Sequence, residues 1–258
     1  MRRAPFAAAA ALLDARQAAI ACAWLCVSGL AIVWIGRATD IDLMLADAVY
    51  ETASGAFPWR HAWLTDTFSH VILKGLLTLA AAWFVLAAAR DLWRPRPGRD
   101  ALERLRLRVV ALSAVLVPML ISTLKHASVA HCPWDLARYG GTQPYLRLFD
   151  ALPLGVPAGH CLPAGHASTA LWLVSLCVYW LPSRPGAAQR VVLLALLFGG
   201  LVGWMQQLRG AHFLTHTLWS IWIACAVVLA IVAGLQWRPL RSDAAAHDYL
   251  AEQLEDAG

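Results

Sequence analysis

The 258-residue chain is too apolar and too poor in charge for an ordinary soluble domain. Of its residues 60% are hydrophobic and 14% are charged, and its mean hydropathy is +0.57, whereas soluble domains carry about 25% charged residues. The net charge of +5 comes from basic residues beside apolar runs, without a nucleic-acid-binding motif. The composition therefore predicts an integral membrane protein and argues against a nucleic-acid partner.

Six apolar runs set the expected architecture, because runs of roughly 18 or more residues are typical of membrane-spanning helices. The first run is too long for a cleaved signal peptide and no small-residue cleavage site follows it, so we expect it to be an uncleaved span. No strand-like alternation or internal repeat competes with this pattern. We predict an all-α bundle of six transmembrane helices that forms a single domain over residues 1–258. The expected spans cover residues about 18–36, 68–89, 107–124, 167–182, 191–208 and 217–236.

The arginines between the spans indicate the orientation. They crowd the link between the second and third spans, and others precede the first span, join the fourth to the fifth and follow the sixth. With six spans these segments share one side, which the positive-inside rule makes cytoplasmic. We therefore expect a multi-pass protein of a bacterial inner membrane, with residues 1–17 and 238–258 in the cytoplasm. The loops 37–67, 125–166 and 209–216 would then face the periplasm.

The first of these loops predicts a helix lying in the membrane interface. Its apolar residues share one helical face, opposite three carboxylates. Such a helix either packs against the bundle or guides a lipid toward a site. The apolar face comprises Ile41, Met44, Leu45, Ala48 and Val49, and the carboxylates are Asp40, Asp47 and Glu51.

The other two loops hold basic side chains that predict an anion site. Lys125 ends the third span, Arg138 follows it, and Arg209 ends the fifth span. Few carboxylates accompany them, and Lys and Arg suit phosphate. The helix starts near Gly165 and Thr215 would add free backbone N–H groups. Six of the nine histidines of the chain lie in or beside these loops: His126, His131, His160, His166, His212 and His216.

In this order the residues resemble the type 2 phosphatidic acid phosphatase family, a family of membrane lipid phosphatases. Its motifs are Lys, six residues, then Arg-Pro; Pro-Ser-Gly-His; and Ser-Arg, five residues, His, three residues, Asp. Lys125, six residues, then Cys132-Pro133 resembles the first motif, and Pro163-Ala164-Gly165-His166 resembles the second. The "QLRGAH" stretch ending at His212 resembles the third. The resemblance covers residues about 107–236 and agrees with six spans.

The chain departs from these motifs at four positions. Arg138 and Arg209 are close enough in sequence to replace the missing arginines, and either His216 or Asp135 is the candidate for orienting His212 in place of the missing aspartate. The departures are Cys132 for arginine, Ala164 for serine, Gln206 for the second arginine and His216 for aspartate.

The resemblance implies a covalent mechanism without a metal or other cofactor. His212 would attack phosphorus to form a phosphohistidine, and His166 would protonate the leaving oxygen and then activate water. Lys125, Arg138, Arg209 and Gly165 would bind the phosphate. The expected substrate is a lipid phosphate or diphosphate in the bilayer, such as an isoprenoid diphosphate, lipid A or phosphatidylglycerol phosphate.

Three alternatives stay open at the level of sequence. A lipid phosphotransferase would use the same histidine. A protein that binds phospholipid without turnover would account for the missing arginines and aspartate. The six outer histidines would also suit a metal or haem site in a carrier or transporter. The sequence leaves the oligomeric state open as well.

Two cysteines in the outer loops predict a disulfide. Cys132 directly follows the first motif region and Cys161 precedes the second, whereas the other four cysteines lie inside spans. An isolated pair in an oxidising compartment favours a disulfide. The bond would join the two loops that we expect to hold the phosphate.

Overall fold

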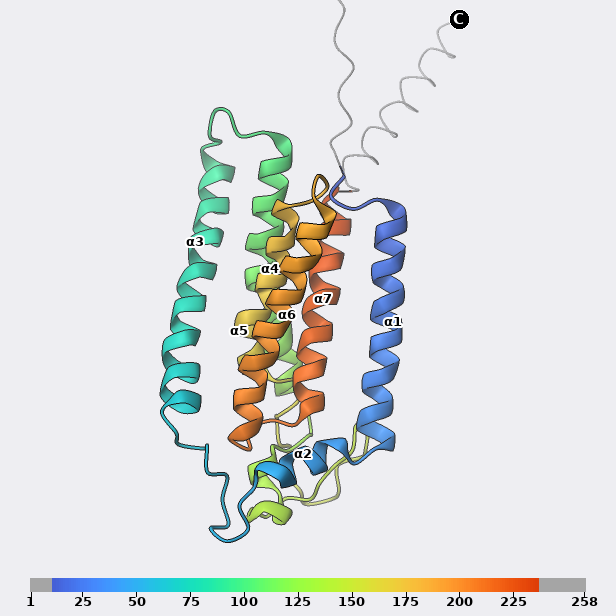
Figure 1. Ribbon diagram of the computed structural model, residues 1–258, viewed down its shortest axis with the longest axis vertical. Helices are drawn as coiled ribbons and strands as arrows, with labels where there is room; N and C mark the ends of the chain where they lie inside the picture. The colour runs from blue at the N-terminus through green and yellow to red at the C-terminus, as the bar shows by residue number, and fades with distance from the viewer. Residues whose placement is uncertain (1–10, 237–258) are drawn as a thin grey trace, which may run out of the picture.

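The computed structural model describes residues 11–236, and within this range the chain forms helices and no strands (Figure 1). A π-helical segment η1 runs directly into α3, and a short α5 runs directly into the 3₁₀ segment η4. The elements are α1 (Ala15–Ala38), α2 (Ile41–Val49), η1 (Leu64–Leu73), α3 (Lys74–Trp93), α4 (Ala101–His126), η2 (Pro133–Asp135), η3 (Ala137–Tyr139), α5 (Gly165–Leu171), η4 (Trp172–Tyr179), α6 (Pro185–Leu208) and α7 (Leu214–Gln236).

Five of these helical segments are long and apolar enough to cross a membrane. They confirm five of the six predicted spans, with η1 and α3 acting as one span. The predicted fourth span differs, because only seven α-helical residues precede eight residues of 3₁₀ helix. A 3₁₀ helix rises about 2.0 Å per residue, so the combined segment still extends for about 27 Å. The five long segments are Ala15–Ala38, Leu64–Trp93, Ala101–His126, Pro185–Leu208 and Leu214–Gln236.

The core lies among α4, α5 with η4, α6 and α7, while α3 and α1 flank this group on opposite sides (Figure 1). Val117 and Ile121 of α4 pack with Leu171 and Trp172 in the largest buried cluster. The outward faces of α1 and α3 expose large apolar side chains, which is the arrangement expected of helices that contact lipid. These side chains include Trp24, Leu30 and Trp34 on α1 and Leu79, Trp83 and Leu86 on α3.

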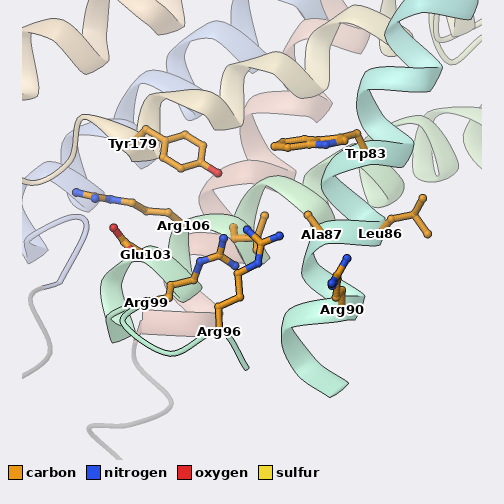
Figure 2. A pocket seen from close by; sticks show the side chains of 10 residues that line it. Trp83, Leu86, Ala87, Arg90, Arg96, Arg99, Glu103, Arg106 and Tyr179 are labelled. Atoms are coloured by element: carbon orange, nitrogen blue, oxygen red, sulfur yellow. The ribbon is translucent and has the colours of Figure 1, made fainter. Parts of the chain in front are cut away.

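The two ends of the bundle differ in charge. At one end the start of α4 meets the end of η4, where Arg106 Nη2 donates to the carbonyl of Leu181 at 2.5 Å. The arginine-rich link between α3 and α4 lies at this end, where two of its arginines line one cavity together with one arginine of α3 and one of α4 (Figure 2). We call it the arginine end. The opposite end carries α2 and the loops 127–164 and 209–213 (Figure 1). The tail 238–258, predicted to be cytoplasmic, lies outside the described residues.

The predicted interfacial helix is α2, which lies across the end of the bundle opposite the arginines (Figure 1). Its inward face differs from the predicted apolar face, because α2 buries Asp42 and Ala46 and leaves Met44 65% exposed. Arg138 of η3, which lies in the loop 127–164, pairs with Asp47 of α2 at 2.6 Å. This pair lowers the pKa of Asp47 below its usual range through the hydrogen bond from Arg138. The helix and the loop 127–164 therefore form one cap over this end.

Candidate active site

Three histidines meet beneath this cap. His212 lies in the loop between α6 and α7, His166 in the first turn of α5 and His216 in the first turn of α7. The ring centroids of His166 and His212 are 5.8 Å apart, and those of His212 and His216 are 5.7 Å apart. The Nδ1 atoms of His212 and His216 approach to 3.5 Å. The structure thus brings both predicted catalytic histidines together with the predicted orienting candidate His216.

A sharp turn after α6 positions His212. Gly210 has a φ of +72°, and a Cβ added there would lie 2.4 Å from the ring of Phe57, so only glycine fits. The N–H groups of Gly210 and Ala211 donate to the carbonyls of Gln207 and Gln206 at 2.9 and 3.0 Å. The glycine of the "QLRGAH" stretch therefore redirects the chain so that the next histidine is buried.

Docking of the α5 start on α7 positions His166. The N–H of Ala164 donates to the carbonyl of His216 at 3.0 Å, and Ser220 Oγ donates to the carbonyl of Ala164 at 3.0 Å. Lys125 runs past the same turn, because a Cβ added at Gly165 would lie 3.7 Å from Lys125 Cδ. The lysine and the histidine of the first two motif regions are thereby held against one another.

Two further basic residues reach this cluster from the second span, and neither of them was assigned to the site from the sequence. The His70 ring centroid lies 4.4 Å from that of His166. The charge of Lys74, one turn further along, acts on His70, Lys125 and His166. Both residues lie at the outer end of an apolar run, as Lys125 does. This position is the sequence feature that could have assigned them to the site. We call His70, Lys74, Lys125, His166, His212 and His216 the basic cluster.

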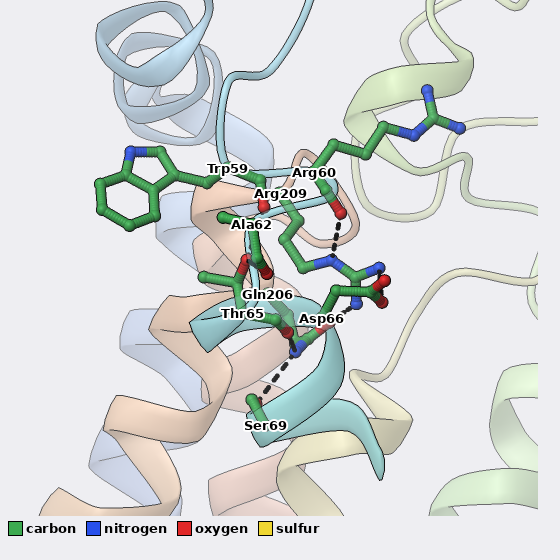
Figure 3. Close-up of polar contacts among 8 residues, drawn as sticks. All are labelled: Trp59, Arg60, Ala62, Thr65, Asp66, Ser69, Gln206 and Arg209. Atoms are coloured by element: carbon green, nitrogen blue, oxygen red, sulfur yellow. Dashed lines mark hydrogen bonds and ion pairs between the residues drawn. The ribbon is translucent and has the colours of Figure 1, made fainter.

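Arg209, which the sequence predicted to bind phosphate, instead forms an ion pair and hydrogen bonds with residues outside the basic cluster (Figure 3). Its Nη2 pairs with Asp66 at 2.7 Å, and its Nε donates to the carbonyl of Arg60 at 3.0 Å. Its Nη1 donates to Gln206 Oε1 at 3.0 Å, and Gln206 Nε2 donates to Ser69 Oγ at 3.3 Å. Gln206, which stands in place of an arginine, thus joins α6 to η1 through neutral bonds, and Asp66 compensates the charge of Arg209.

The remaining predicted residues lie in the cap. Arg138 is bound to Asp47, and within residues 11–236 the Asp135 carboxylate makes no hydrogen bond to a histidine. A carboxylate that the sequence did not reveal is Asp42, which accepts hydrogen bonds from the N–H of Thr215 at 3.0 Å and from Thr215 Oγ1. Burial raises the pKa of Asp42. Asp42 therefore caps the helix that carries His216.

The electrostatic surroundings of His212 favour a neutral imidazole. Burial, followed by the neighbouring His216, His166 and Lys125, lowers the pKa of His212 well below its ordinary value of 6.5. A histidine must be unprotonated on one nitrogen to act as a nucleophile. His212 meets this requirement at neutral pH.

Cys132 and Cys161 lie at disulfide distance, with their Cα atoms 5.4 Å apart. Cys161 Sγ lies 3.5 Å from His212 Nδ1, so the pair borders the basic cluster. These three residues also form a group whose possible metal-ligand atoms lie within 4.8 Å of one another. Sulfurs bonded to each other are not thiolate ligands, however, so this group gives little support to a metal site.

We predict that replacing both Cys132 and Cys161 with serine lowers the free energy of unfolding by about 3 to 4 kcal/mol, because the bond closes a 29-residue loop. The measurement is thermal unfolding of the detergent-solubilised protein. Peptide mapping after alkylation without reductant is the control on the bond itself. Alkylation of both Cys132 and Cys161 in the wild-type protein would contradict the prediction.

Comparison with known families agrees with this geometry. A model of the PAP2 superfamily matches residues 106–240, which is just over half of the chain. The chain belongs to the PAP2 superfamily. No curated protein and no solved structure matches it. The PAP2 match covers Lys125, His166, His212 and His216, and it leaves His70 and Lys74 outside. PAP2 proteins are generally phosphatase-like hydrolases, which suggests an activity on phosphate esters.

Proposed function

We propose that this protein is a membrane phosphatase that hydrolyses a lipid phosphate or diphosphate through a phosphohistidine on His212. The observation that carries the proposal is the approach of His166 and His212, 5.8 Å apart between ring centroids, within a basic cluster at one end of a membrane bundle. An acid and a nucleophile at this spacing suit an in-line displacement at a phosphorus atom between them.

The reaction would proceed in two steps. His212 Nδ1 faces His216 Nδ1 at 3.5 Å, which leaves His212 Nε2 to attack phosphorus while the bond to the leaving oxygen breaks. The negative charge of the bound phosphate favours the protonated form of His166, which donates its proton to that oxygen. In the second step His166 removes a proton from water, which attacks the phosphohistidine and releases inorganic phosphate and free His212.

The charge on the phosphate would be stabilised chiefly by Lys125, with Gly165 leaving room for the approach of its side chain. Lys74 of α3 adds positive charge, a contribution absent from the sequence prediction, and the His70 ring of η1 lies beside that of His166. Arg209 would contact phosphate only by releasing Asp66, and Arg138 only by releasing Asp47. We therefore assign these two arginines a smaller contribution to phosphate binding than the two lysines.

An apolar cavity supports a lipid as the substrate. Its volume is about 510 Å³, and it is lined by His216 together with Tyr145, Phe213, Trp219 and Trp222. A lipid tail would fit such a cavity while its phosphate reaches the basic cluster. An isoprenoid diphosphate, lipid A and phosphatidylglycerol phosphate are the candidate substrates.

The proposal includes a sixth crossing of the membrane by α5 and η4. These segments run beside α4 over most of its length. Gly165, at their start, lies near Lys125 at the end of α4, and Leu181, just after them, accepts a hydrogen bond from Arg106 near the start of α4. With six crossings and the arginine end in the cytoplasm, both termini are cytoplasmic and His212 faces the periplasm of a bacterial inner membrane. The basic cluster is built from imidazoles and ammonium groups, which suit a phosphate anion without a divalent metal.

The test is a panel of ³²P-labelled lipid phosphates and diphosphates presented to purified protein in detergent with and without a chelator. We expect release of inorganic phosphate in both conditions, and an acid-labile, base-stable label on the protein after rapid quenching. Transfer of the label to an acceptor lipid would favour the phosphotransferase. Binding of these lipids without turnover would favour a non-catalytic protein, the alternative that the missing arginines and aspartate support.

We predict that the acidic limb of the kcat/KM profile lies below pH 6.5. The folded-state pKa of His212 is lowered from 6.5, so the nucleophile stays neutral as the pH falls through 6.5 and becomes protonated only below that value. The measurement is kcat/KM between pH 4 and 8, with ³¹P titration of the substrate in the same detergent as the control. A limb above pH 6.5 that does not follow the substrate would contradict the prediction.

A further inference from the structure

The arginine end contains a cavity that the phosphatase mechanism does not use. Its volume is about 470 Å³, and it lies between α3, the α3–α4 link, α4 and the end of η4 (Figure 2). Arg90 comes from α3, Arg96 and Arg99 from the link, and Arg106 from α4. Arg90, Arg96 and Arg99 thus direct their guanidinium groups toward one space, whereas the guanidinium of Arg106 extends away from them and donates to the carbonyl of Leu181 (Figure 2).

The charge in this cavity is poorly compensated. Four guanidinium groups line it against one carboxylate, that of Glu103. Arg99 pairs with Asp91 at 2.9 Å behind the wall, whereas Arg90 and Arg96 have no ion pair within residues 11–236. The Nε atom of Arg106 is buried without a hydrogen-bond partner. Buried polar atoms are normally paired, so this donor lacks the acceptor that such atoms usually have.

Membrane sidedness alone does not account for this arrangement. The positive-inside rule places arginines on one side of a membrane, but it does not require them to converge on a cavity. Arg94 and Arg108 satisfy the rule from positions that do not line the cavity. Gathering like charges costs energy unless a counter-charge is present. The planar guanidinium matches phosphate through paired N–H donors, which makes phosphate the fitting counter-charge.

The outer wall of the cavity indicates where the phosphate comes from. Trp83 and Leu86 line it from α3, and their side chains are 64% and 69% exposed on the face that contacts lipid. Tryptophan is enriched at headgroup depth, and clustered basic residues beside a span recognise anionic headgroups. We propose that this cavity binds the phosphate-bearing headgroup of an anionic membrane lipid, in the leaflet opposite the histidines. A soluble phosphate monoester would share the same chemistry.

The test compares two double variants that lose the same charge at the same end. Arg90→Gln with Arg96→Gln removes the two unpaired cavity arginines, and Arg94→Gln with Arg108→Gln removes two exposed arginines outside it. Each protein is titrated in neutral detergent with phosphatidylglycerol, phosphatidylcholine or glycerol 3-phosphate, and thermal unfolding reports binding. We expect the cavity variant to bind phosphatidylglycerol about tenfold more weakly or worse, and the control variant to bind like the wild type.

The outcomes separate the two sources of phosphate. Stabilisation by phosphatidylglycerol, without an effect of glycerol 3-phosphate, supports a lipid headgroup. If glycerol 3-phosphate stabilises the wild type as much as phosphatidylglycerol does, and the cavity variant loses this effect, the result supports the same site with a soluble ligand. Equal losses in the two double variants, or no difference between phosphatidylglycerol and phosphatidylcholine, would overturn the proposal. The readout does not depend on turnover, so it stands apart from the test of the phosphatase.

Discussion

Replacing His212 with asparagine is expected to lower kcat for phosphate release from a lipid substrate by at least about 10⁴-fold. The imidazole is the only group proposed to bond to phosphorus, so no partial reaction remains when it is removed. Asparagine keeps a polar side chain of smaller size beside His216 and Cys161, which limits disturbance of the buried site. The measurement is release of ³²P-phosphate together with the rapid-quench label on the protein.

The two copies of Pro-Ala-Gly-His provide a matched control for this experiment. His160 belongs to the first copy, is exposed and has a φ of +50°, a conformation that asparagine tolerates. His160→Asn should leave activity unchanged, whereas His166→Asn should slow both steps. Because His166 protonates the leaving oxygen, its loss should matter less for a substrate whose leaving group is already a weak base. A His212→Asn variant that still forms the labelled protein would refute the assignment of the nucleophile.

The sequence predicted the bundle well, since long apolar runs have few structural alternatives in a membrane. It was least accurate at residues 167–182, where composition suggested an ordinary span. The chain there forms one short α-helix and a 3₁₀ helix, and packing between α4 and α6 stabilises a conformation that hydropathy does not encode.

The site was predictable where the residues adjoin a motif. His166, His212 and His216 meet as the motif spacing indicated. The partners of the arginines were not predictable, because Asp66 and Asp47 lie more than 90 residues from Arg209 and Arg138 in sequence. Such pairs depend on how loops fold over the bundle. Asp42 shows the same limit, since it lies on α2 and caps α7 across a separation of 173 residues from Thr215 in sequence.

His216 is expected to act as a positioning residue for His212, and its replacement with leucine should lower kcat by about 10²-fold or more with a smaller change in KM. The two Nδ1 atoms approach to 3.5 Å, and a hydrogen bond from His212 Nδ1 to His216 Nδ1 would leave Nε2 of His212 for the substrate. Leucine fills a similar volume but cannot accept the Nδ1–H hydrogen bond, so the imidazole would lose its preferred tautomer and orientation.

Two further replacements at this position separate positioning from packing. His216→Asn and His216→Asp each offer an oxygen near the present Nδ1, and both should retain activity within about tenfold of the wild type. Thermal unfolding of all three variants controls for loss of the fold, since His216 is only 4% exposed. If the leucine variant is as active as the asparagine variant at equal stability, His216 does not orient His212. Rescue by aspartate would instead indicate that histidine and carboxylate serve the same purpose beside the nucleophile.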